Sequence, residues 1–283
     1  MFFNRKVFLA AIFFFIVVPF GVWKLYRHKY PAYVPLPPRA EVTLTIIPGW
    51  NLRQVADYLV KVGVVSTTDD IYDVTGRPAV DYSNIKTRPF NTELMEGYFP
   101  GSVQNGASYE GYLAPETYRV FRGARVEEVV DKLMAERKKQ ITPQILEAIK
   151  QSGKTVHEIL TMASILEEEA KALPDRRLVA DILWRRKSKN WALQVDSSVH
   201  YAADKTGTVF TSDKERAVDS LWNTYKYPGL PPGPISAPSV ESIQAALYPE
   251  KNNYWYFLSG TDGKMHYAKT LEEHNLNRAK YLR

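Results

Sequence analysis

The sequence contains no cysteine among its 283 residues. This absence excludes disulfide bonds, a thiol nucleophile and every metal site built on thiolates. The five histidines are scattered, with no H-x-H or H-x-x-x-H pair, so a histidine metal site is not expected. A phosphate-binding loop, a G-x-S-x-G nucleophile turn and a dinucleotide fingerprint are also missing. We therefore expect a protein that works without a metal and without a bound cofactor.

An excess of one charge is missing from most of the chain. Six of the 37 lysines and arginines precede Glu41, no aspartate or glutamate does, and from Glu41 onward basic and acidic residues balance at 31 each. A balanced surface does not attract polyanions in general, so nucleic acid is not an expected partner. Apolar residues make up 45% of the chain, which is enough for a conventional core and excludes a disordered chain.

One long hydrophobic run lies near the N-terminus. Residues Val7–Trp23 carry no charge and follow the basic pair Arg5 and Lys6. As a helix this run spans about 25 Å, close to the thickness of a bilayer core. No small-residue cleavage site follows it, so we expect an uncleaved single-pass membrane anchor within residues 1–29 and not a buried core helix. The flanking charges alone leave the orientation of this anchor open.

A linker and a small module are expected next. Residues 30–40 contain four prolines and are typical of a stiff, extended spacer. Alternation of apolar residues with threonine predicts a strand over 42–47, and apolar spacing predicts a helix over 52–61. A second strand, glycine and helix follow within 118–133, either as a weak internal repeat or by chance. Residues 66–108 give no clear element.

The rest of the chain is predicted to be mainly helical. Apolar spacing with caps and stop residues indicates four helices, over 126–139, 142–151, 155–172 and 174–187. After Trp191 the chain is turn-rich and aromatic, with a strand pair expected over 254–267 and a last helix over 271–281. The sequence thus predicts an α+β fold: a small α+β module over 41–108, then a mainly helical domain over 109–283 with a C-terminal β-hairpin.

The helix expected over 155–172 places one glutamate among apolar residues. At 100° per residue its apolar side chains form one stripe, and Glu167 lies inside this stripe while Glu168 and Glu169 lie outside it. A carboxyl group in apolar surroundings has a raised pKa, as a general acid at neutral pH requires. The alternative for Glu167 is a structural ion pair, but the sequence identifies no buried arginine partner. We therefore predict Glu167 as the catalytic acid and a solvated face for Glu168 and Glu169.

No second carboxylate stands at a fixed spacing from Glu167. Glu116 and Asp196 are candidates, but each could equally cap a turn or a helix. A loop rich in proline and glycine covers residues 228–235. Such a loop either walls a groove or merely connects two elements.

Four motifs occur in order along the chain. They are Glu110-Gly111-Tyr112-Leu113-x-Pro115-x-Thr117-Tyr118, Ala163-Ser164-Ile165-Leu166-Glu167-x-Glu169, Leu193-Gln194-x-Asp196 and Asn223-Thr224-Tyr225-x-x-x-Gly229-Leu230-Pro231-Pro232-Gly233-Pro234-Ile235. Together they resemble the YceG-like family of endolytic murein transglycosylases, from about residue 110 to the C-terminus and more weakly over 42–65. Three positions depart from the usual family residues: Ala114 replaces Phe, Glu116 replaces Asp and Ser197 replaces Pro.

The resemblance implies a location, an organisation and a reaction. It implies a single-pass protein of the cell inner membrane, with its N-terminus inside, a LysM-like module over 41–108 and an extracytoplasmic catalytic domain over 109–283. It implies that Glu167 protonates the glycosidic oxygen beyond N-acetylmuramic acid in nascent peptidoglycan, after which the C6 hydroxyl of that sugar closes a 1,6-anhydro ring. The residues then expected to contact the glycan strand are Glu116, Tyr118, Gln194, Asp196, Asn223 and Tyr225. Peptidoglycan synthases are candidate protein partners.

Two alternatives stand beside this expectation. The first is a non-catalytic peptidoglycan-binding scaffold of the cell-wall synthesis machinery, which would have no need of a carboxyl group in an apolar stripe. The second is a cytoplasmic lyase that uses pyridoxal phosphate, against which the expected anchor argues. A hydrolase typically uses two carboxylates, whereas an internal sugar hydroxyl removes the need for one that activates water. The lack of an evident second carboxylate in the sequence therefore favours the transglycosylase.

Overall fold

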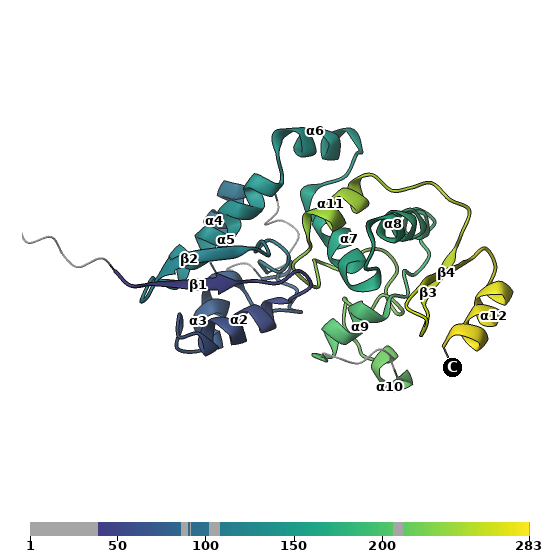
Figure 1. The fold of residues 1–283 in the computed structure, drawn as a ribbon, viewed down its shortest axis with the longest axis horizontal. Helices are drawn as coiled ribbons and strands as arrows, with labels where there is room; N and C mark the ends of the chain where they lie inside the picture. The colour runs from purple at the N-terminus through teal and green to yellow at the C-terminus, as the bar shows by residue number, and fades with distance from the viewer. Residues whose placement is uncertain (1–38, 86–89, 91, 102–107, 206–211, 283) are drawn as a thin grey trace, which may run out of the picture. The chain divides into compact units, whose positions relative to one another are not determined.

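The computed structural model describes residues 39–85, 90, 92–101, 108–205 and 212–282, which are coloured in Figure 1. The expected membrane segment and nearly all of the expected linker lie outside these residues. Within the described ranges, no helix is both long enough and apolar enough to cross a membrane. Residues 41–283 form one compact unit.

A two-stranded antiparallel sheet begins this unit. β1 (Glu41–Thr45) pairs with β2 (Thr117–Phe121), so that the first residue of each strand lies opposite the last residue of the other. Each strand is followed by a helix, α2 (Leu52–Lys61) after β1 and α5 (Val126–Gln140) after β2. The predicted strands and helices are confirmed, and the two strand–glycine–helix segments pair through their strands.

The sheet joins the two regions that the sequence analysis predicted as separate domains, with a boundary at residue 108. β1 lies before this boundary and β2 after it, with α3 (Thr68–Thr75) and α4 (Thr92–Tyr98) in between. The sequence predicted no element here, because both helices are short and largely polar. α3 packs against α2 and α5 through Ile71 and Val74, so this stretch belongs to the same core as the helices that follow it. A LysM-like identity for 41–108 stays a prediction.

Four consecutive helices form the middle of the unit in the predicted order: α5, α6 (Pro143–Gln151), α7 (Val156–Glu169) and α8 (Leu173–Ser188). Local sequence explains where they start. Thr142 caps α6, which has a proline at its first position, and Thr155 forms a capping box with Glu158 at the start of α7. α7 ends at Glu169 because the backbone of Ala170 is extended (φ −142°, ψ 138°).

α7 lies at the centre of the helical part of this unit and is buried on nearly all sides. α8, α9 (Asp196–Ala202) and α11 (Val240–Leu247) pack around it, and every residue from 159 to 166 is fully buried. The prediction that α7 has one buried stripe and one solvated face is therefore wrong. A helical wheel assumes a surface helix, whereas neighbouring helices also cover the side of α7 opposite the stripe.

The C-terminal end of the unit is a hairpin followed by a helix. β3 (Tyr256–Ser259) and β4 (Met265–Ala268) pair in antiparallel register, and α12 (Leu271–Tyr281) packs on both strands. The predicted strand pair and last helix are confirmed. The described structure is thus mainly helical, with two small antiparallel sheets, and the short helices α9, α10 (Asp213–Arg216) and α11 were not predicted.

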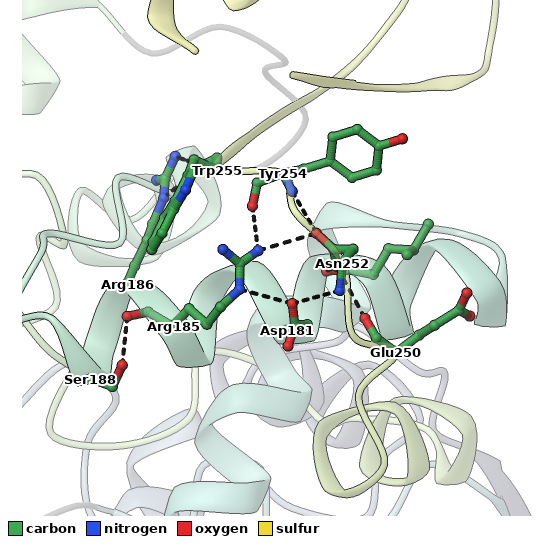
Figure 2. A network of polar contacts seen from close by, with 9 residues as sticks. Asp181, Arg185, Arg186, Ser188, Glu250, Asn252, Tyr254 and Trp255 are labelled. Carbon is green, nitrogen blue, oxygen red and sulfur yellow. Dashed lines mark hydrogen bonds and ion pairs between the residues drawn. The ribbon is translucent and has the colours of Figure 1, made fainter. Parts of the chain in front are cut away.

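A polar network holds the chain before β3 on α8, as Figure 2 shows. Arg185 donates from Nε to Asp181 (2.9 Å) and from Nη2 to Asn252 (3.1 Å), and it also contacts the Tyr254 carbonyl. The backbone N–H of Asn252 donates to the same Asp181 carboxylate at 3.1 Å. These contacts fix the start of the hairpin relative to the helix that follows α7.

Candidate active site

A cleft of about 1290 Å³ is the main candidate for a functional site. It is lined by the first turn of α2, the end of α7, α9, the hairpin β3–β4 and α12. Its volume is larger than the ~300–1,000 Å³ that is typical of small-molecule pockets. The cleft therefore has room for a segment of a polymer.

Glu167 is held in a buried ion pair and does not line this cleft. Its Oε1 accepts a 2.9 Å hydrogen bond from Arg176, and its Oε2 accepts bonds from the N–H and hydroxyl of Ser239 at 2.8 and 2.5 Å. The side chains of Glu167 and Arg176 are only 8% and 11% exposed. The buried arginine partner that the sequence did not identify is therefore Arg176. With both oxygens engaged, Glu167 fixes the N-cap residue of α11, as the structural alternative requires.

Glu169, at the last position of α7, lines the cleft. Its Oε1 accepts hydrogen bonds from the Ser197 hydroxyl at 2.6 Å and from the Ser197 N–H at 3.4 Å. Burial raises the pKa of the Glu169 carboxyl, Ser197 lowers it, and the negative charge of Asp196 raises it further, for a net upward shift. Glu169 therefore has the properties that the sequence had assigned to Glu167.

Glu168 also lines the cleft, between its two neighbours. Desolvation raises the pKa of its carboxyl to about 7, Ser236 opposes this shift, and the charges of Glu169 and Glu167 reinforce it. The backbone of Gly49 approaches this carboxyl closely: a Cβ atom at Gly49 would lie 3.1 Å from the Glu168 Oε1. The expected solvated position is thus confirmed for Glu168, which is exposed, but not for Glu169, which is partly buried and whose carboxyl has a raised pKa.

Three of the predicted glycan-binding residues meet in the cleft: Gln194, Asp196 and Tyr225. The Tyr225 hydroxyl donates a 2.7 Å hydrogen bond to Asp196, and the Arg216 guanidinium lies over the Tyr225 ring, 5.2 Å from its centre. Gln194 has a positive φ of 53°, and its N–H donates to the Thr224 carbonyl at 3.1 Å. The Leu193–Asp196 and Asn223–Tyr225 motifs are therefore joined directly.

The other three predicted binding residues do not line the cleft. Glu116 is exposed at the start of β2 and accepts from the N–H of Thr117 at 2.9 Å. Tyr118 is buried, and its hydroxyl donates to the Ala114 carbonyl at 2.7 Å. Asn223 is fully buried and donates to two backbone carbonyls of the segment 216–218. Their contacts stabilise turns and strand ends, so we do not retain them as glycan-binding residues.

The chain after β1 contributes a wall of the cleft. The N–H of Gly49 donates to the Ala237 carbonyl at 2.9 Å, and the N–H of Ala237 donates to the Trp50 carbonyl at 2.8 Å. Asn51 and Gln54, which form the capping box of α2, line the cleft beside them. The region predicted as a separate small module is therefore part of the site.

The loop over 228–235 has a mixed role. Ile235 lines the cleft, whereas Leu230, Pro231 and Pro232 line a second, smaller pocket of about 290 Å³. The loop packs tightly on the first motif, because a Cβ atom at Gly111 would lie 2.4 Å from the Pro234 Cβ. Both sequence interpretations of this loop, groove wall and connection, are thus partly confirmed.

Three carboxyl groups line the cleft, those of Glu168, Glu169 and Asp196. Among the residues that the structure describes, no group of three or more His, Cys, Asp or Glu side chains is arranged to hold a metal ion. The arrangement can instead supply and accept protons, through Glu169 and Glu168, next to an Asp196 carboxylate positioned by Tyr225.

Comparisons with known proteins agree with this fold. The model of the YceG-like family matches residues 30–280, so the chain belongs to the YceG-like family. A Bacillus subtilis relative named endolytic murein transglycosylase is 38% identical over 192 residues, which cover 65% of this chain and 53% of the relative. A Streptococcus pneumoniae relative of the same name is 34% identical over 253 residues, which cover 85% of this chain and 44% of the relative.

A solved structure has the same fold. The crystal structure of a YceG-like protein from Listeria monocytogenes superimposes with a TM-score of 0.72 at 33% identity, covering 84% of this chain and 75% of that one. The chain spans about half the length of the curated relatives it matches.

Proposed function

We propose that this chain is a lytic transglycosylase that cleaves the glycan strands of peptidoglycan from within. Membership of the YceG-like family and relatives named endolytic murein transglycosylase support this activity. The observation that carries the proposal is Glu169, a partly buried carboxyl group with a raised pKa in the wall of a cleft large enough for a polymer. A non-catalytic scaffold would not need such a group there.

Glu169 is the general acid of the proposed reaction. Its proton passes to the glycosidic oxygen between N-acetylmuramic acid and the next sugar, the C1–O bond breaks, and positive charge develops at C1 of the muramic acid. The resulting Glu169 carboxylate accepts the proton of the C6 hydroxyl as that oxygen bonds to C1. The products are a 1,6-anhydro end and a free hydroxyl on the leaving sugar, and no water is consumed.

Ser197 and Asp196 support opposite states of this acid. The Ser197 hydroxyl stabilises the charged Glu169 that exists after the first proton transfer, and the Asp196 charge favours the protonated form needed before it. Asp196, held by Tyr225, also places negative charge in the cleft where positive charge develops on the sugar.

Hydrolysis is the second candidate reaction. Of the two candidate second carboxylates from the sequence, Asp196 lines the cleft and Glu116 does not, and Glu168 lines the cleft as well. Either Asp196 or Glu168 is of the right type to activate a water molecule. The carboxylates alone therefore do not separate the two reactions, and the family relationship favours the transglycosylase.

Product analysis tests the proposed reaction. Purified sacculi are incubated with the protein, and the released fragments are examined by mass spectrometry with and without borohydride reduction. We expect fragments of several disaccharides that end in 1,6-anhydro-N-acetylmuramic acid, which are one water lighter than hydrolytic products and resist reduction. Reducible muramic acid ends would support hydrolysis, and early release of single disaccharides would contradict cleavage within strands.

We also propose that residues 1–29 anchor the chain in the cell inner membrane and that residues 41–283 lie outside the cytoplasm, where peptidoglycan is found. The uncharged run Val7–Trp23 supports this location. A reporter fused to the C-terminus should behave as exported. Cytoplasmic activity of the same fusion would contradict the proposed topology.

A further inference from the structure

A cluster of basic side chains lies at the hairpin end of the cleft. Arg186 of α8 and His274 and Arg278 of α12 all line the cleft, as does Tyr256 of β3. The Arg186 guanidinium lies 5.4 Å from the centre of the Tyr256 ring, and the His274 ring stacks on the same tyrosine at 5.3 Å. Arg186 and His274 therefore flank one aromatic ring, and Arg278 lines the same cleft and acts electrostatically on His274.

Within the residues that the structure describes, no carboxylate pairs with the arginines of this cluster. Arg186 is 4% exposed, and its described hydrogen bonds go to the backbone carbonyls of Leu193 and Trp255, of which Trp255 is labelled in Figure 2. In the described part of the chain, neither Arg186 nor Arg278 forms an ion pair. A buried cation satisfied only by neutral groups leaves a positive potential in the cleft wall.

His274 is exposed to this positive potential and has a ring nitrogen without a hydrogen-bond partner in the described residues. Its pKa is lowered, first by burial and then by the positive charges of Arg278 and Arg186. Its Nδ1 is buried and has no hydrogen-bond partner within the described residues. A buried polar atom without a partner is costly, and a bound ligand that accepts its hydrogen would remove that cost.

We propose that Arg186, His274 and Arg278 bind a carboxylate of the stem peptide that a peptidoglycan strand carries. This inference rests on the proposed function, because it places the strand in this cleft. An anion here would accept charge-assisted hydrogen bonds from Arg278, satisfy His274 and compensate the charge of Arg186. The catalytic carboxylates in the same cleft would repel such an anion, so the basic cluster also sets the orientation of the strand.

A peptide carboxylate fits this site better than a phosphate does. A strand that is cut at internal positions carries stem peptides along its length, so many binding registers bring a carboxylate to the hairpin end. A lipid-linked diphosphate occurs only once, at the end of a nascent strand. Cleavage within strands therefore favours the peptide as the anion that the basic cluster binds.

Equilibrium binding of defined oligosaccharides tests this site. The chain with Glu169→Gln is titrated with peptide-bearing peptidoglycan oligosaccharides, with the same oligosaccharides freed of peptide, and with peptide-free ones that end in a diphosphate. We expect the peptide-bearing form to bind about tenfold more tightly than the peptide-free form, as one charge-assisted contact provides. Adding Arg278→Gln should abolish this difference, and Arg278→Lys should keep part of it.

Lys280→Gln is the matched control, because it removes the same charge from the same helix outside the cleft. This variant should keep the full preference for peptide. Equal binding of both forms by the parent, or a preference that survives Arg278→Gln, would overturn the proposal. So would an Arg278-dependent gain seen only with the diphosphate. Wild-type cleavage of the peptide-free strands is measured in parallel, and its absence alongside a peptide preference would count against the proposed reaction and not against the site.

Discussion

The Ser197 hydroxyl donates a 2.6 Å hydrogen bond to Oε1 of Glu169. The N–H of Ser197 contacts the same oxygen at 3.4 Å. Proline, which the family resemblance leads us to expect at this position, has neither a hydroxyl nor an N–H. This chain therefore stabilises the charged form of its proposed acid with two contacts that a proline cannot make.

Replacing Ser197 by alanine should move the pH profile of cleavage. Ser197 lowers the pKa of Glu169, so its loss raises that pKa and keeps the acid protonated to higher pH. We expect the alkaline limb of the kcat/KM profile to shift upward by about 0.5 to 1 pH unit, the order of one hydrogen bond to a charged group. A downward shift, or none, would mean that Glu169 is not the titrating acid.

Breaking the Glu167–Arg176 ion pair should cost stability. Removing one partner of a buried pair leaves an uncompensated charge, so Glu167→Gln should lower the free energy of unfolding by about 2 to 4 kcal/mol. The more exposed pair Glu158–Lys187, which likewise joins α7 to α8, offers the control, and Glu158→Gln should cost about 1 kcal/mol or less. Urea denaturation of both variants measures the difference. Equal effects would contradict the structural role of Glu167.

The sequence predicted where the helices lie better than it predicted which neighbours pack against them. Caps at Thr142 and Thr155 and the apolar spacing of 52–61 are local signals, and the helices they predict are present. Which glutamate faces the cleft depends instead on how α8, α9 and α11 pack around α7. No periodicity in one helix contains that information, and the wheel therefore selected the glutamate that meets Arg176.

Because Gly111 lies in tight contact with Pro234, we expect that no larger residue is tolerated at this position. Gly111→Ala adds a Cβ that would lie 2.4 Å from the Pro234 Cβ, at a positive φ of 77°. We expect a loss of about 2 kcal/mol or more, from overpacking added to backbone strain. Gly153 also has a positive φ but nothing within 4 Å, so Gly153→Ala should cost only about 1 kcal/mol. Similar losses in thermal unfolding would contradict the close approach.

Glu110 should make stability depend on pH. It is 3% exposed and accepts bonds from the Leu52 N–H and the Tyr201 hydroxyl, but burial dominates and raises its pKa to about 7. A raised folded-state pKa contributes stability below the unfolded value of 4.5, and this contribution is lost as the pH rises toward 7.

Glu110→Gln removes this titration and is the test. The stability of the parent relative to Glu110→Gln should decrease from about pH 4.5 to 7. Comparison of the two proteins cancels the carboxylates they share. A difference in melting temperature that stays constant over this range would show that Glu110 does not titrate there.

Contacts between residues far apart in the chain could not be predicted from the sequence. Asp196 and Tyr225 were both candidates from their motifs, but their hydrogen bond appears only when α9 and the 223–225 turn come together. Ser197 was visible only as a departure from the family pattern. The cluster of Arg186, His274 and Arg278 had no local signal at all, since it unites two helices nearly 90 residues apart in the chain.

The central claim is that Glu169 is the acid, and three neighbouring variants test it most directly. Glu167→Gln, Glu168→Gln and Glu169→Gln are compared, per folded molecule, for the rate at which 1,6-anhydro ends form on purified sacculi. We expect Glu169→Gln to lose about 100-fold or more, as removal of a general acid predicts, and the other two to retain at least about a tenth of the activity. Substantial activity in Glu169→Gln, with loss in folded Glu167→Gln, would contradict this account and restore Glu167 as the catalytic residue.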